Sequence, residues 1–160
     1  MPSATWSNCE RDFEPDGSLR DIYVLETSLA DWERLLQALP STYQLHFQSG
    51  DLETLPSTAS EAFRLAQVQG ALLKIDAEGI KVHCHFFWDR DIEFDVDPKE
   101  IASEREFRSL VSFMRFTGQA LGKPVRLTPE NLQEHRILEY HPATDCVVYY
   151  PPNHGSPDER

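Results

Sequence analysis

The sequence predicts an α+β protein with a mainly antiparallel or mixed sheet and helices packed chiefly on one face. Apolar residues recur at helical spacing in three segments, at about 29–39, 59–69 and 104–121. Three β-rich segments, 71–75, 80–88 and 92–96, are separated only by short polar turns, which predicts a central three-strand meander. Strands and helices do not alternate regularly, so a doubly wound parallel sheet is disfavoured.

The third helix is the longest and has a signal at each end. Ser103 with Glu106 fits a capping box, in which the Ser hydroxyl accepts a hydrogen bond from the Glu backbone N–H. Gly122 suits the left-handed position after the last turn, and Pro124 prevents further helix. The apolar stripe of this helix needs a sheet to cover it, and we expect the rest of the chain to supply that sheet.

The other elements follow from shorter signals. Thr58 with Glu61 fits a second capping box. Thr128 followed by Pro129 predicts one or two helical turns. Runs of β-branched and aromatic residues predict further strands at 22–25, 43–47, 124–127, 136–140 and 146–150.

We expect a single globular domain at residues 19–150, since a chain of 160 residues is long enough for one sizeable core. Residues 1–18 are polar and include Pro15-Asp16-Gly17, which predicts a flexible arm. Residues 151–160 are polar and rich in Pro, which predicts a disordered tail.

The sequence favours a cytoplasmic protein that does not bind membranes. It contains no run of about 18 apolar residues, and its start lacks the basic and apolar stretches of a signal peptide. Cys9, Cys84 and Cys146 are odd in number, widely spaced and without a CxxC pair. Such cysteines fit free thiols in a reducing compartment better than a disulfide framework.

The charge balance bears on the kind of partner. The net charge is −12, which repels the phosphate backbone and disfavours nucleic-acid binding. The same charge attracts a basic protein and speeds its arrival. The alternative is that the acidity serves solubility alone. There is no GxGxxG motif and no P-loop, and we expect no cofactor.

The segment 88–97 carries the candidate partner-binding residues. Glu93, Asp95 and Asp97 alternate with apolar residues and so share one strand face. A ridge that alternates with core residues is typical of a solvated surface, but like charges crowded on one face cost stability, which is a hint of a docking role. Trp88 lies at a hairpin tip, where an exposed aromatic ring would anchor a protein partner. The predicted binding residues are Trp88, Asp89, Asp91, Glu93, Asp95 and Asp97.

An alternative function is a small metal-dependent hydrolase. His83 and His85 share one strand face, and two imidazoles at this spacing can bind one metal ion. Asp95 or Glu93 on the next strand would supply the third ligand. The other interpretation is that both histidines face outward or line a polar groove. Cys84, between them, points to the opposite apolar face and is expected to be a buried structural cysteine.

No catalytic residue is assigned. Cys146 has His141 and Asp145 nearby, but their spacing matches no nucleophile signature.

The stretch from Phe113 to Asn131, FMRFTGQALGKPVRLTPEN, is similar to a stretch of small bacterial proteins, some of which resemble immunity proteins of polymorphic toxin systems. It covers about an eighth of the chain and consists of helix-to-strand punctuation. The resemblance implies a compact acidic α+β protein without catalysis, and it transfers no functional residue.

Our first hypothesis is a non-catalytic cytoplasmic protein-binding protein, in its narrowest form an immunity-type inhibitor that occludes a basic toxin through an acidic surface. The alternatives are the hydrolase with His83, His85 and Asp95, and a structural or assembly subunit. The last of these includes a homodimer that shares sheet edges.

Overall fold

The computed structural model of the protein describes residues 2–152 and confirms the α+β class. Its sheet has eight strands in the order β2-β3-β4-β5-β1-β6-β7-β8, and every pairing is antiparallel. The strands are β1 (Arg20–Val24), β2 (Gln44–Gln48), β3 (Leu72–Ala77), β4 (Ile80–His85), β5 (Ile92–Val96), β6 (Val125–Pro129), β7 (Leu138–His141) and β8 (Cys146–Tyr149). The predicted meander is confirmed as β3-β4-β5, although its middle strand ends at His85 and not at Trp88.

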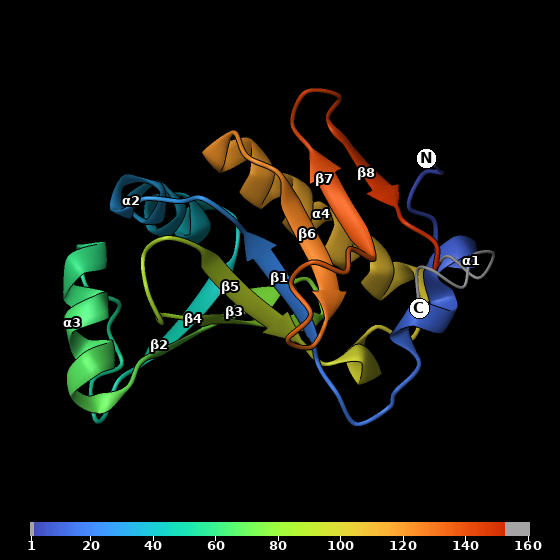
Figure 1. The fold of residues 1–160 in the computed structure, drawn as a ribbon. Coiled ribbons are helices and arrows are strands. Elements are labelled where there is room, and N and C mark those ends of the chain that lie inside the picture. Colours follow the sequence, from blue (N-terminus) through green and yellow to red (C-terminus); the bar gives the residue numbers. More distant parts are fainter. Residues whose placement is uncertain (1, 153–160) are drawn as a thin grey trace.

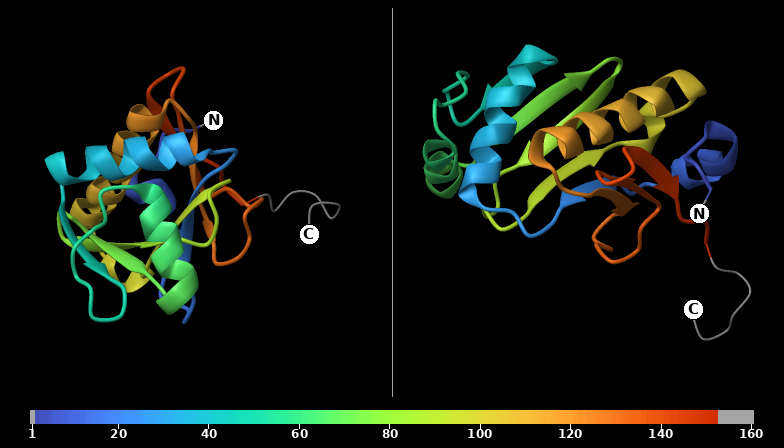
Figure 2. Two further views of the ribbon diagram at one scale, coloured as in Figure 1. Left: turned by 90° about the vertical axis from the view of Figure 1, so that its left-hand side faces the viewer. Right: turned by 90° about the horizontal axis from the view of Figure 1, so that it is seen from above.

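The helices are α1 (Trp6–Cys9), α2 (Leu29–Ala38), α3 (Ala59–Gln69) and α4 (Glu104–Leu121), with single 3₁₀ turns at Glu10–Phe13, Leu39–Ser41 and Pro98–Glu100. The three predicted helices are confirmed to within a residue at their ends. Figures 1 and 2 show α2 and α4 on one face of the sheet, with α3 beside α2 at one end of the molecule. In residues 2–152 no helix covers the other face, which we call the open face.

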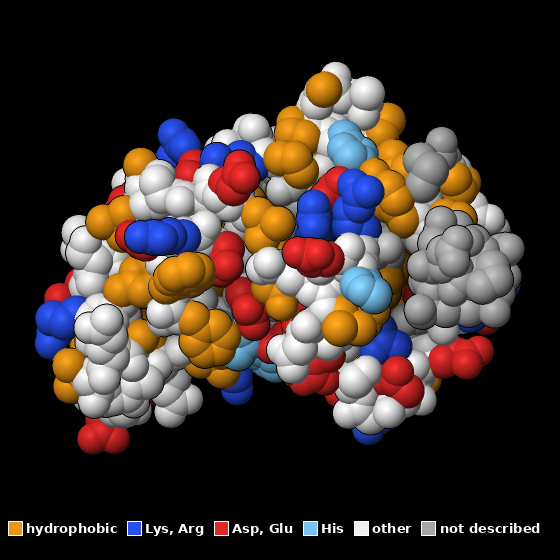
Figure 3. All heavy atoms as spheres, viewed as in Figure 1, with side chains coloured by type: hydrophobic (Ala, Val, Ile, Leu, Met, Phe, Trp, Pro, Cys, Tyr) orange, Lys and Arg blue, Asp and Glu red, His pale blue; other side chains and the backbone are white. Residues whose placement is uncertain are grey.

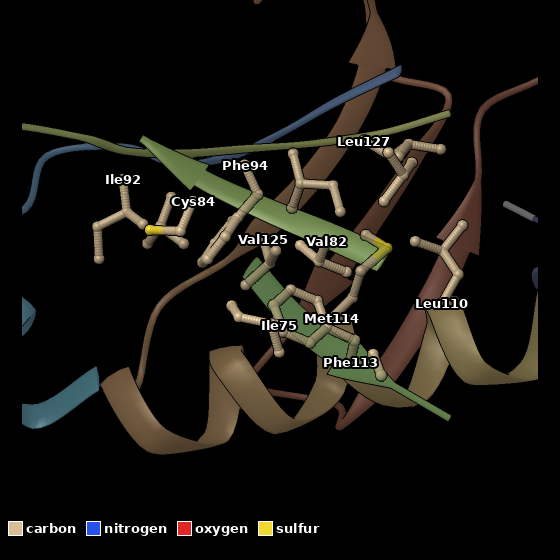
Figure 4. Packing of buried hydrophobic residues seen from close by; sticks show 14 of the residues in the cluster. Ile75, Val82, Cys84, Ile92, Phe94, Leu110, Phe113, Met114, Val125 and Leu127 are labelled. Carbon is tan, nitrogen blue, oxygen red and sulfur yellow. The ribbon is translucent and has the colours of Figure 1, made fainter. Parts of the chain in front are cut away.

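The core lies between the sheet and the helices α2 and α4. Figure 4 shows Phe113 and Met114 of α4 facing side chains of the sheet, among them Phe94 and Val82. Cys84 belongs to this layer and is fully buried, as predicted, and burial raises the pKa of its thiol. Because side chains alternate along a strand, the residues between these core positions point to the open face.

The ends of α4 agree with the sequence only in part. Gly122 has a φ of 66°, the left-handed conformation expected of it. The capping box is wrong: Ser103 makes no bond to a backbone N–H, and its hydroxyl donates instead to Glu106 Oε1 at 2.6 Å. A serine and a glutamate at this spacing can form either a capping box or a direct bond between their side chains. The sequence alone does not distinguish the two.

The helical part of the N-terminal segment, residues 6–13, packs against the rest of the molecule. Cys9 and Phe13 are buried in the core, and the Ala4 N–H donates to the carbonyl of Val147, so the chain runs along the edge of β8. The flexible arm expected at residues 1–18 stays a prediction, and the structure packs Cys9 and Phe13 of that segment into the core. Most of the predicted tail 151–160 lies outside the described residues.

The helix expected at Thr128 and Pro129 is also wrong. Strand β6 continues through both residues, because they pair with Asp21 and Arg20 on β1. The chain then turns at Asn131, whose φ is 60°. The interstrand pairing overrides a local helix signal here.

Candidate partner-binding surface

The open face carries a polar centre built from the three middle strands. Cross-strand pairing forms one row from His83, Asp95 and Asp21, and a second row from His85, Glu93 and Tyr23. We call these six residues the polar centre. Figure 3, which looks onto the open face, shows acidic and histidine side chains gathered in its middle.

Asp95 is held between the two histidines. Its Oδ1 lies 3.2 Å from His83 Nδ1 and its Oδ2 lies 2.5 Å from His85 Nε2. Since a carboxylate only accepts, each imidazole donates an N–H to it. The hydrogen bond from His85 to Asp95 raises the pKa of His85 above its ordinary value, and the negative charges of Asp95, Glu93 and Asp21 act in the same direction against burial. Asp95 is itself buried.

Asp21 is a buried acid that sequence reasoning missed. It accepts hydrogen bonds from the Asn131 backbone N–H at 2.8 Å and from the Tyr23 hydroxyl at 3.0 Å. Burial, with the charge of Asp95 directly opposite, raises its pKa. The alternation of Asp21 and Tyr23 with Ile22 indicates that the two polar side chains share one strand face. The sequence does not indicate that β5 is the neighbouring strand, which places Asp21 opposite Asp95.

Glu93 is the acid of the polar centre left without a partner. Its carboxylate is half-buried and makes no hydrogen bond or ion pair with residues 2–152. Burial raises its pKa, and the negative charge of Asp21 raises it further, while His85 lowers it. A positive charge next to this carboxylate would stabilise its ionised form. Among the described residues His85 does so only in part, because the pKa of Glu93 stays raised.

Two exposed aromatic side chains follow β4. Phe87 is 68% exposed and Trp88 is 52% exposed. The Phe87 ring stacks on His85 with centroids 5.0 Å apart and an interplanar angle of 3°, so the aromatic pair adjoins the polar centre. The Arg90 guanidinium lies 5.4 Å from the centre of the Trp88 ring. The exposure expected of Trp88 is present, whereas Phe87 was counted only as strand.

A shallow groove of about 410 Å³ opens beside these rings. Leu29 of α2, Phe63 of α3, Phe87, Trp88 and Asp89 line it. We call it the aromatic groove. The groove lies where the loop after β4 meets α2 and α3.

The predicted binding residues do not form one continuous ridge. Trp88 and Asp89 lie at the groove, and Glu93 and Asp95 lie in the polar centre. Asp97 has a structural role, because its Oδ1 accepts from the Lys99 N–H at the start of a 3₁₀ turn. Asp91 is half-buried and contributes to the raised pKa of Glu93.

The alternative metal site is brought together but is not arranged for a metal. His83, His85 and Asp95 meet, yet both carboxylate oxygens face ring nitrogens. Among residues 2–152 no group of three or more His, Cys, Asp or Glu side chains could hold a metal ion. This geometry gives the hydrolase hypothesis no support.

The nominal Cys146 set is not assembled either. His141 Nε2 lies 2.8 Å from the Tyr150 hydroxyl, and Asp145 pairs with the Arg115 guanidinium. The Cys146 thiol donates to the Thr144 carbonyl.

Comparison with protein-family models, with curated proteins and with solved structures gave no match. Within the described part of the chain, none of the helices combines the length and apolar character needed to cross a bilayer.

Proposed function

We propose that the protein is a non-catalytic binding protein whose partner is a basic protein, and that the open face is the binding surface. The observation that carries the proposal is Glu93, a half-buried carboxylate with a raised pKa and without a hydrogen-bonding partner in residues 2–152. It lies on the same face as the buried acids Asp21 and Asp95 and near two exposed aromatic rings.

Binding would work by charge neutralisation and apolar burial. A Lys or Arg side chain placed on Glu93 relieves its repulsion with Asp21 and forms a charge-assisted hydrogen bond. Phe87 and Trp88 then lose their exposed area to the partner, which supplies the apolar contribution. The net charge of −12 steers the basic partner to the molecule.

The narrower proposal is an immunity-type inhibitor acting in the cytoplasm. Its acidic open face would fill the basic active-site cleft of a toxin and exclude the substrate. The partial resemblance of Phe113–Asn131 to immunity-type proteins supports this form.

The test is selection of peptides from a random displayed library on the immobilised protein at neutral pH. We expect the selected peptides to be enriched in Lys and Arg. Glu93→Gln should weaken a selected peptide about tenfold or more. Glu10→Gln is the matched control, because it removes the same charge from an exposed position in the 3₁₀ turn after α1 and should leave the affinity unchanged.

Two results would overturn the proposal. One is a library that yields no peptide, or only acidic or uncharged peptides. The other is an association rate that does not change when the ionic strength is raised from about 0.05 to about 0.5 M, since exposed charges are then strongly screened.

A further inference from the structure

We propose that the aromatic groove receives one large apolar side chain of the partner, with a basic residue next to it. The inference rests on the proposed function and specifies the segment recognised. That segment is amphipathic, with a Leu, Met or aromatic anchor for the groove and Lys or Arg for the polar centre.

The groove has a rigid floor. Phe63 packs edge-on against Trp32, with ring centroids 4.9 Å apart, and against Phe86 at 5.7 Å. Trp32 is fully buried, so the floor is part of the core. A side chain that enters the groove therefore meets a preformed apolar surface.

The rim is also held in place. The Asp89 carbonyl accepts from the Thr27 hydroxyl at 2.7 Å and from Trp32 Nε1 at 3.2 Å. The Thr27 N–H donates to the Arg90 carbonyl at 2.9 Å. These bonds fix the loop that presents Trp88, so a partner does not have to order it, and less entropy is lost on binding.

Charge decides what kind of segment fits. Arg64, the basic residue of the groove lining, already pairs with Glu61. The Asp89 carboxylate lies at the rim and makes no ion pair with residues 2–152. The Arg90 guanidinium, 5.4 Å from the centre of the Trp88 ring, offsets the charge of Asp89 at the rim. The uncompensated negative charge next to the groove is that of Glu93 in the polar centre, and it favours basic residues beside the anchor. A second copy of the chain is a poorer occupant, because it carries the same net charge of −12.

The stack of Phe87 on His85 makes the groove and the polar centre one continuous surface. One short segment can thus place its anchor in the groove and its cation on Glu93. Neither half alone gives this selectivity, because apolar side chains enter many grooves and cations bind many acidic surfaces.

The experiment uses one peptide from the library selection and the change in Trp fluorescence as the protein is titrated with it. Trp88 is the exposed tryptophan of the chain, and a blue shift is expected when its ring is covered. Phe87→Ala should weaken the peptide about tenfold or more. Val68→Ala is the matched control: it truncates a side chain 69% exposed on α3 that does not line the groove, and it should have no effect.

A peptide with its apolar anchor replaced by Ser completes a double-mutant cycle between the anchor and Phe87. Wild-type protein should bind it about tenfold more weakly, and Phe87→Ala should then cost little more, because both changes remove the same contact. Circular dichroism checks that Phe87→Ala is folded, and Leu29→Ala, which truncates a groove-lining residue of α2, serves as the second variant.

The outcomes separate the two proposals. Peptides that depend on Glu93 but not on Phe87 or Leu29 overturn this inference and leave the proposed function standing. A library without binding peptides overturns both. A dimer of the free protein in sedimentation that is lost in Phe87→Ala would show that a second copy occupies the groove, which also overturns the inference.

Discussion

Replacement of Asp95 by Asn tests whether this carboxylate holds the charge of His85. The hydrogen bond from His85 Nε2 spans 2.5 Å between two largely buried groups, and a bond to a charged group contributes about 1.5–3 kcal/mol. Asp21 lies directly opposite Asp95, and removing one of two facing like charges returns about 0.2–1 kcal/mol. We therefore expect Asp95→Asn to lower the free energy of unfolding by about 1–2 kcal/mol at about pH 6.

The pH dependence has a definite sign. The folded-state pKa of His85 is raised above the unfolded value of 6.5. Its contribution to stability is therefore complete below that value and is lost as the pH rises through the folded-state pKa. The cost of Asp95→Asn should shrink by about half at about pH 9, where the neutral imidazole donates a weaker bond.

Urea unfolding of both proteins at the two pH values measures these free energies. Histidine NMR titration of the variant should show the pKa of His85 moving down toward its ordinary value. Equal destabilisation at both pH values, with an unchanged His85 titration, would refute the assignment of Asp95 as the group that raises the pKa of His85.

Two further predictions concern packing and thiol chemistry. A Cβ at Gly118 would lie 2.2 Å from Cδ2 of the Tyr140 ring, so Gly118→Ala should destabilise by about 1–3 kcal/mol in urea unfolding, whereas an unchanged midpoint would mean that the ring moves freely. In a thiol-modification assay the exposed Cys146 should react at once. Cys9, whose pKa burial raises to about 12, and Cys84 should react only on unfolding, so fast labelling of all three thiols would contradict the described core.

Much of the fold could be predicted because its signals are local. Long helical periodicity located α4, and the short turns between β-rich runs located the meander. The errors arose where contacts with a segment distant in the sequence determine the local conformation or the burial of a residue. Thr128 looks like a helix cap in isolation, but pairing with β1 keeps it in a strand. Phe13 looks like part of a polar arm, but it packs against Phe107 of α4.

The candidate site could be predicted only in outline for the same reason. Alternation along the strands put His83, His85 and Asp95 on shared faces, and the structure brings them together. The position of β1 beside β5 is a non-local fact, so Asp21 could not be placed next to Asp95. The aromatic groove joins α2, α3 and the loop after β4, and no single stretch of sequence indicates it.

The most direct test of the central claim is a map of where a selected basic peptide binds, by amide NMR shifts on the ¹⁵N-labelled protein. We expect the largest shifts in β5, in the end of β4 and in the loop that carries Phe87 and Trp88. Shifts centred instead on the exposed side of α4 or on the β7–β8 edge would contradict that claim.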